Sequence, residues 1–168
     1  MSLLTHLGLT TPPLGATTPH YGPYALIFNF IFAYGLLSSR TLKQYYGIDH
    51  NSSPREDLTK YGDAAVSSGK ITRAQLEMLK RNESAHANAV ENYALLVGAV
   101  AAAGFAGVDS VAVNRAAVGY TLARIVYAGV YVLVPTGYER LSQLRGVCWW
   151  TANVCCLSLL WKAGQLLA

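Results

Sequence analysis

Polar side chains interrupt the start of a long apolar run in residues 80–100, KRNESAHANAVENYALLVGAV. His86, Asn88 and Glu91 fall within the first two turns of that run. An ionisable group inside a membrane costs about 2.5–3.5 kcal/mol on insertion scales for Asp, Lys and Arg, so such groups are normally paired or functional. Arg124, on a later apolar run, is the natural partner for Glu91. These residues predict either a buried pair that ties two helices together or a polar ligand site.

Two sets of polar residues recur at helical spacing, which places each set on one helix face. The first set has intervals of three and four residues: Arg81, Ser84, Asn88 and Glu91. The second set has the same spacing on a later segment: Tyr120, Arg124, Tyr127 and Tyr131. If the two faces meet, they offer cations for carboxylates, partners for an amine, and phenols that donate to an anion. They would suit a peptide-like anionic ligand, although a tyrosine stripe is also typical of a helix core or an interfacial belt.

The composition indicates a protein whose surroundings are mostly not water. Of 168 residues, 52% are hydrophobic and 13% are charged, and the mean hydropathy is +0.27. A soluble domain carries about 25% charged residues. The net charge of +4, without basic and aromatic residues on a common face, does not favour nucleic-acid binding. Cys148, Cys155 and Cys156 share one apolar segment in a spacing typical of neither a zinc site nor a disulfide framework, so no metal site is predicted.

Four apolar stretches are long enough to cross a bilayer, which takes about 20 helical residues. They cover about 21–39, 84–105, 111–134 and 146–167. Helices are expected because a lone strand in lipid leaves its backbone unpaired. The fold prediction is therefore an all-α integral membrane four-helix bundle, with residues 1–168 as a single membrane domain. Between the first two spans, 51–70 reads as loop and 71–81 as an extension of the second helix.

Basic residues fall on alternate connections between these spans. The polar stretch 40–83 holds eight Lys or Arg residues, and the connection after the third span holds Arg140 and Arg145. The turn between the second and third spans holds none. The positive-inside rule then makes 40–83 a cytosolic loop and places both termini on the opposite side. In this multi-pass arrangement Glu91 and Arg124 lie at similar depths near the cytosolic face.

The segments AHANAVENY and ARIVYAGVY resemble the membrane-associated proteins in eicosanoid and glutathione metabolism, the MAPEG family. The layout is similar over all four spans, and the H-x-N-x-x-E and R-x-x-Y-x-x-x-Y spacings make the resemblance specific across residues 81–141. It implies a homotrimer of four-helix subunits that binds glutathione between neighbouring subunits near the cytosolic face. In a eukaryote it implies the endoplasmic reticulum.

The resemblance also implies roles for individual residues, carried over by position. Asn88 and Glu91 would hold the amine or the carboxylates of glutathione, with His86 beside them at the edge of the site. Tyr127 and Tyr131 would line the site from the third helix.

The arginines complete the implied site. Arg140 corresponds to the arginine that faces the thiol in several family members, and Arg40 or Lys43 loosely matches an arginine of the first helix. Arg81 and Arg124 are counted among the binding residues. Many members carry an arginine at the position of Ser84, and Arg81, one turn earlier on the same face, could reach the same ligand group.

The predicted activity is glutathione-dependent chemistry on a lipophilic electrophile that arrives from the bilayer. A thiol of pKa about 8.5 is mostly neutral at pH 7, and a nearby cation with a phenol donor favours the nucleophilic thiolate. Arg140 is predicted to stabilise the thiolate, and Tyr131 or Tyr127 to donate to it. Transfer, isomerisation and peroxide reduction remain open outcomes.

Two other readings keep the same fold. The absence of arginine at Ser84 and Ala87 could mark an isomerase or cyclase that works without glutathione, with His86, Glu91 or the tyrosines as acid and base. It could also mark a non-catalytic, lipid-binding scaffold. A channel or transporter is disfavoured because the spans show no internal repeat.

Overall fold

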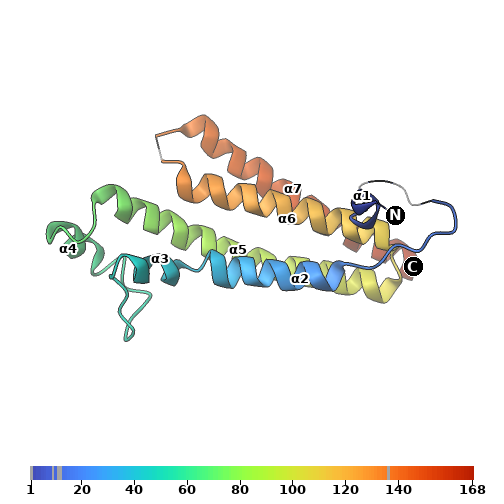
Figure 1. Ribbon diagram of the computed structural model, residues 1–168, viewed down its shortest axis with the longest axis horizontal. Helices are drawn as coiled ribbons and strands as arrows, with labels where there is room; N and C mark the ends of the chain where they lie inside the picture. The colour runs from blue at the N-terminus through green and yellow to red at the C-terminus, as the bar shows by residue number, and fades with distance from the viewer. Residues whose placement is uncertain (1, 9, 11–12, 136) are drawn as a thin grey trace.

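The computed structural model describes residues 2–8, 10, 13–135 and 137–168, which form helices, turns and loops with no strand among them. The elements are α1 (Leu3–His6), α2 (Gly22–Phe30), the π-helix η1 (Ile31–Leu36), α3 (Ser39–Tyr45), α4 (Gly62–Ser67), α5 (Arg73–Ala106), α6 (Ser110–Leu133) and α7 (Glu139–Leu167). Figure 1 shows the long helices running along a common direction, with α2 and α7 both packed against α5 and α6. The all-α prediction is confirmed for the described residues.

α5 begins and ends at local sequence signals. Thr72 caps its first turn through reciprocal hydrogen bonds with Gln75. Gly107 ends it with a φ of +74°, a conformation that glycine adopts without steric cost. Its 34 residues span about 50 Å at helical rise, more than the roughly 30 Å of bilayer hydrocarbon. α5 begins at Arg73, so most of 71–81 is helical, as predicted. Because no residue after Glu91 in the helix is charged, the extension of its N-terminal end beyond the membrane stays a prediction.

Three helical segments of the described chain are long and apolar enough to cross a membrane: Gly22–Tyr45, Arg73–Ala106 and Ser110–Leu133. The fourth predicted span, 146–167, lies within α7, which is long enough but less apolar because it carries Asn153 and Lys162 among its residues. α7 packs along α5 and α6. Its crossing of the bilayer stays a prediction.

Small side chains fill much of the core between α5, α6 and α7. The buried alanines there are Ala99, Ala103, Ala116, Ala123, Ala152 and Ala163. At Gly119 of α6, a Cβ atom would lie 3.0 Å from Cys155 Sγ of α7, so glycine lets these two helices approach closely. Close backbone approach is a main source of helix attraction in lipid, where burying apolar surface gives little advantage.

A π-helix, η1, interrupts the first membrane segment directly after α2. Its wider turn is marked by the hydrogen bond from Leu37 N to Phe32 O at 2.9 Å. Two side chains of α5 reach its carbonyl groups: His86 Nδ1 lies 3.0 Å from Ala33 O, and Asn82 Nδ2 donates to Leu37 O at 3.3 Å. These contacts fasten the wider turn of the first segment to α5.

Residues 40–83, predicted as a cytosolic loop with helix only over 71–81, form a small folded unit that includes the first turns of α5. Its own core consists of Ile48, Leu58, Ile71, Leu76 and Leu79. The helix α4 lies inside 51–70, the stretch predicted to be irregular. Gly62 begins this helix where a Cβ atom would lie 2.8 Å from Leu76 Cδ1. Packing on α5 therefore stabilises a helix that is too short to be recognised from its own sequence pattern.

A buried ion pair holds this unit on α3. Lys43 Nζ lies 3.2 Å from Asp57 Oδ2, and both side chains are almost fully buried. Asp57 Oδ1 accepts hydrogen bonds from the His50 backbone N (3.0 Å) and lies 2.8 Å from His50 Nδ1. Burial alone would raise the pKa of Asp57, but the hydrogen bonds from His50 and Lys43 outweigh it and lower the pKa from its ordinary 3.8. Asp57 therefore stays ionised at neutral pH and neutralises the buried ammonium.

Candidate functional site

A buried arginine joins α5 to α6. Arg124 is 2% exposed, and its Nη2 donates to Asn88 Oδ1 at 2.9 Å. Its guanidinium carbon lies 4.5 Å from the centre of the Tyr127 ring, a cation–π arrangement. The sequence predicted Glu91 as its partner, but Glu91 is exposed and forms no ion pair with Arg124 among the described side chains. That predicted pair is wrong for the single chain, because Asn88, one turn earlier, meets the guanidinium instead.

A second arginine–tyrosine contact joins α6 to α7. The guanidinium carbon of Arg145 lies 4.4 Å from the centre of the Tyr131 ring. The Tyr131 and Tyr127 rings meet edge to face, with centres 5.5 Å apart. Sequence reasoning placed Arg145 in a connection, because the fourth helix was expected to begin at residue 146. α7 begins at Glu139, so Arg145 lies in its second turn and faces α6.

These contacts border a groove between α5, α6 and the first half of α7, where Figure 1 shows α7 leaning away from α6. Its widest part is a cavity of about 570 Å³, lined by residues that include Asn88, Tyr127, Tyr131, Arg145, Trp149 and Trp150. A cavity of about 440 Å³ continues from Asn88 and Trp149 to Asn153. A third, of about 360 Å³, continues from Arg145 to Arg81. Since neighbouring cavities share lining residues, they form one space, named here the α5–α7 groove.

The deep end of the α5–α7 groove is polar and buried. Asn92 Nδ2 donates to Asn153 Oδ1 at 2.7 Å, linking α5 to α7. Within the described chain, the buried Asn92 Oδ1 has no hydrogen-bond partner, and neither has Nη1 of Arg124, the residue bonded to Asn88. Buried polar atoms are normally satisfied. Hydrogen-bonding capacity is therefore left unused on α5 and α6 near this groove.

Arg81 lies at the opposite end of the α5–α7 groove. Its Nε and Nη2 donate to Val132 O at 3.3 and 3.2 Å, and it lines the same cavity as Arg145. Ser84 is exposed, and its hydroxyl donates to Lys80 O within α5 at 3.1 Å. Two cations therefore stand at this end of the groove, although the chain has serine where the resemblance implies arginine.

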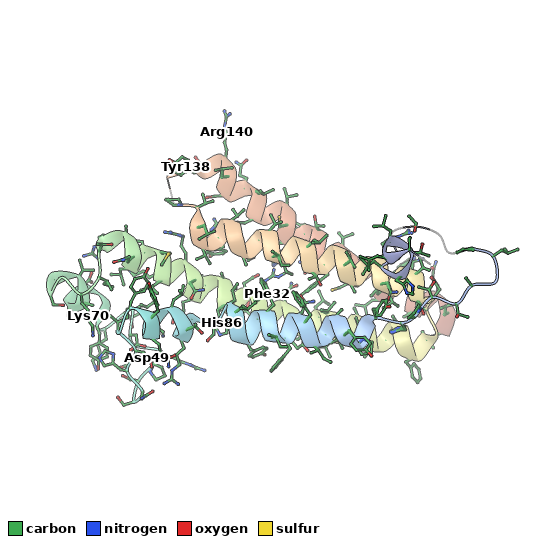
Figure 2. The ribbon with its side chains drawn as sticks, in the orientation of Figure 1. Phe32, Asp49, Lys70, His86, Tyr138 and Arg140 are labelled. Atoms are coloured by element: carbon green, nitrogen blue, oxygen red, sulfur yellow. The ribbon has the colours of Figure 1, made fainter. Side chains whose placement is uncertain are left out.

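Three predicted site residues lie outside the groove. His86 faces the first membrane segment, where its ring meets that of Tyr34 at an interplanar angle of 88°. Arg40 lies on α3 and pairs with Asp49 at 3.1 Å. Arg140 is exposed, and Figure 2 shows its side chain pointing away from the other helices. The single chain thus gathers Asn88, Tyr127, Tyr131 and Arg81 around one space, with Glu91 on its wall, and leaves these three apart. Arg124 does not line this space but is hydrogen-bonded to Asn88, which does.

Sequence reasoning missed the contribution of α7 to this site. Arg145, Trp149 and Asn153 recur every four residues and therefore share one helix face. Each lines a part of the α5–α7 groove. This spacing can be seen in the sequence. It was missed because the fourth span was expected to begin at residue 146, which assigned Arg145 to a loop and the other two residues to a helix.

Among the described residues, an all-helical fold with three apolar helices long enough to span a bilayer is typical of a helical membrane protein. The chain belongs to the MAPEG family: the family's model matches residues 21–165 of the 168-residue chain. The match covers α2 through nearly all of α7 and confirms the predicted family. No curated protein and no solved structure matches the chain.

Proposed function

We propose that this protein is a membrane-bound enzyme that uses the thiol of glutathione against a lipophilic electrophile. The observation that carries this proposal is the α5–α7 groove itself, in which the Arg145–Tyr131 contact of 4.4 Å stands beside the Arg124–Asn88 hydrogen bond of 2.9 Å. Polar groups of this density are costly inside a membrane protein and mark function more often than structure. Membership of the MAPEG family supports the same class of chemistry.

The groove fits the charges of glutathione, which has two carboxylates, one amine and two amides. Arg81 and Arg145 provide cations at one end. Asn88 and Glu91 provide an amide and a carboxylate on the α5 wall. The unpartnered Nη1 of Arg124 provides a further buried donor. In this arrangement Arg81 replaces the cation that is absent at Ser84.

Arg145 is the group best placed to favour the thiolate. A cation near the sulfur lowers the pKa of a thiol from about 8.5 and raises the fraction of nucleophile at pH 7. The Tyr131 phenol, beneath the guanidinium, donates to the sulfur or to the electrophile. The thiol proton passes to solvent, the sulfur lone pair forms the new bond to carbon, and the leaving group or an adjacent atom of the electrophile takes the displaced electron pair. An isomerase or a peroxidase would begin from the same thiolate.

We also propose that the protein assembles as a homotrimer of four-helix subunits. Trp150, Val154 and Leu157 expose apolar surface along α7, next to a groove that is open on that side. A neighbouring subunit on this face would close the groove. Arg140, which points away from its own groove, would then lie where it can approach the neighbour. In a eukaryotic cell the expected location is the endoplasmic reticulum.

The decisive experiment compares two arginines of α7. On addition of glutathione to the purified protein in detergent, thiolate formation is read from its near-ultraviolet absorbance, with wild type, Arg145→Gln and Arg140→Gln side by side. Arg145→Gln is expected to lose the signal and the turnover of a generic aromatic electrophile, whereas Arg140→Gln keeps both. The reverse result would transfer the role to Arg140. A wild-type protein that neither binds glutathione nor forms the thiolate would overturn the proposed function.

One observation favours a second candidate. Ser84 and Ala87 are exposed, uncharged positions on α5, where family members often carry arginine. An isomerase or cyclase of a hydrophobic metabolite, or a lipid-binding scaffold, would not need those cations. Calorimetric titration with glutathione separates both of these candidates from the glutathione-dependent enzyme, since neither of them predicts a heat of binding.

A further inference from the structure

A second cavity lies at the other end of the helices from Arg145, on a different side of α6. It has a volume of about 500 Å³ and lies between α1, the start of α2 and the first half of α6. Figure 1 shows α1 at this end of the molecule, far from the start of α7. Its lining from α6 comprises Asn114, Ala117, Val118, Thr121 and Leu122, none of which borders the α5–α7 groove. The proposed function makes no use of this space.

The N-terminal segment is held over this cavity by specific contacts with α6. Asn114, which is 1% exposed, donates to His6 O at 2.7 Å and to Pro19 O at 2.8 Å, and its Oδ1 accepts from Tyr21 N at 2.8 Å. One asparagine thus satisfies three backbone groups of the cover. Because all three hydrogen bonds come from one buried side chain, they hold His6, Pro19 and Tyr21 in fixed positions against α6.

A second contact shows how closely the cover approaches α6. Gly8 has a φ of +74°, and a Cβ atom there would lie 2.5 Å from Val111 O. The carbonyl of Gly8 accepts from Arg115 Nε at 2.9 Å. Only glycine allows this approach. Specific contacts with α6 therefore define this cavity, which is not a gap beside a loosely packed terminus.

The mouth of the cavity opens between apolar side chains. Leu3, Tyr24, Phe28 and Leu122 all line it and are all exposed. α2 and α6 belong to segments able to span a membrane, so in a bilayer this mouth would open toward lipid hydrocarbon. An empty apolar space loses dispersion contacts on every wall, and the volume lies within the usual range for ligand sites. A flexible alkyl chain from the bilayer would restore those contacts.

The polar side chains of the described lining differ between its two ends: toward Phe28, the hydroxyl of Thr121 is engaged with Asn29 Nδ2 and Ala117 O. Tyr21 Oη lies 3.3 Å from His6 Nδ1 at the end where α2 begins, whereas Phe28 lies seven residues further, about 10 Å along the helix. A single-chain lipid with a polar head would place that head between His6 and Tyr21 and its tail toward Phe28 and Leu122. This direction also keeps the head near the membrane surface.

We propose that this cavity binds a long-chain fatty acid, with its carboxyl group at the His6–Tyr21 pair and its alkyl chain along α2 and α6. The site is distinct from the α5–α7 groove and does not depend on the glutathione chemistry proposed above. The N-terminal segment acts as its cover.

The probe is palmitic acid carrying a photoreactive diazirine near the end of its chain. The full-length protein is placed in phosphatidylcholine nanodiscs, irradiated with the probe, and the labelled residues are mapped by mass spectrometry. Val118→Trp fills the cavity from α6, and Ala25→Phe fills it from α2. Val126→Trp is the matched control, because this valine is exposed on α6 two turns further and does not line the cavity.

Labelling is expected around Phe28 and Leu122, with a several-fold loss in both filling variants and none in the control. Unlabelled palmitic acid should compete, and hexadecane should not, since it lacks the head group. Labelling spread over exposed apolar residues, unchanged by either filling variant, would overturn the proposal. Equal competition by hexadecane would overturn the assignment of a fatty acid. An unchanged thermal midpoint of Val118→Trp in nanodiscs shows that the variant is folded, and this control holds whether or not the protein binds glutathione.

Discussion

Arg124 on α6 donates to Asn88 on α5 at 2.9 Å from a guanidinium that is only 2% exposed. The two helices run in opposite directions, so this bond fixes their relative depth at a single level. Tyr127 covers one face of the same guanidinium. The glutathione site proposed for the α5–α7 groove depends on this contact between Arg124, Asn88 and Tyr127.

Replacing Asn88 tests this contact directly. Asn88→Ala removes the acceptor of a buried charged donor and is expected to destabilise the protein by about 1.5–3 kcal/mol. Asn88→Asp restores an acceptor and should recover most of that loss. The measurement is the thermal midpoint of the protein in detergent, with Gln143→Ala, on the exposed rim of the groove, as control. Equal midpoints for Asn88→Ala and Asn88→Asp would contradict the role of the hydrogen bond.

The Arg145–Tyr131 contact predicts different results for two changes at one position. Tyr131→Phe keeps the ring beneath the guanidinium but removes the phenol, so glutathione affinity should stay close to wild type while turnover falls. Tyr131→Leu removes the ring as well, and a cation–π contact of about 0.5–2 kcal/mol is lost with it. Affinity should then fall roughly twofold to thirtyfold, as 1.4 kcal/mol is about tenfold. Titration calorimetry and steady-state rates measure the two effects, and similar affinities for both variants would show that the ring does not position Arg145.

Asp57 gives the folded unit of residues 40–83 a dependence on pH. Its pKa in the folded protein lies below the ordinary 3.8, so its ion pair with Lys43 contributes stability that is complete above pH 3.8. That stability falls as the pH drops through the lower, folded value. Amide hydrogen exchange of this unit, relative to the middle of α6, should therefore accelerate below about pH 4.

A matched variant isolates this effect. Asp57→Asn removes the carboxylate that pairs with Lys43, so the unit should be weakened at pH 7 and should lose the acid-dependent step. A variant that still shows the step would assign it to another group.

Asn114 predicts the behaviour of the N-terminal segment. Asn114→Ala leaves the backbone groups of His6, Pro19 and Tyr21 without their partner. Limited proteolysis in nanodiscs should then cut the segment before α2 faster than in wild type. Ser158→Ala, which removes only a bond to Cys155 O within α7, is the control. Unchanged cleavage in Asn114→Ala would show that other contacts hold the cover.

The sequence predicted α6 to within one residue at each end, 111–134 against Ser110–Leu133. A largely apolar run, interrupted by few charged or amide side chains and bounded by Asp109, whose side chain caps the first turn, leaves little ambiguity. The start of α7 was placed too late, because its first turns are polar and lie before the apolar stretch. Hydropathy marks where a helix enters lipid, not where the helix begins.

The sequence predicted some contacts of the candidate site correctly and others wrongly. Residues three and four apart on α5 and α6 were correctly placed on shared faces, which brought Asn88 and Tyr127 to one groove. His86 was grouped with Asn88, although residues two apart on a helix point in nearly opposite directions; it faces the first segment instead. The choice of Asn88 over Glu91 as partner of Arg124 depends on a shift of one helical turn between antiparallel helices, which no local pattern fixes.

The π-helix η1 has a consequence for the tolerance of the chain to length changes. A π turn accommodates an extra residue relative to an α-helical turn. Deleting one residue between Ile31 and Leu36 would let the segment close into regular α-helix with little rotation of the preceding portion, because the wider turn holds the spare residue. Asn29, which donates to Thr121 Oγ1 at 2.8 Å, would then keep its partner. A deletion in a regular α-helical stretch would instead rotate the preceding residues by about 100°, so η1 is the place in the first segment where a change of length is best tolerated.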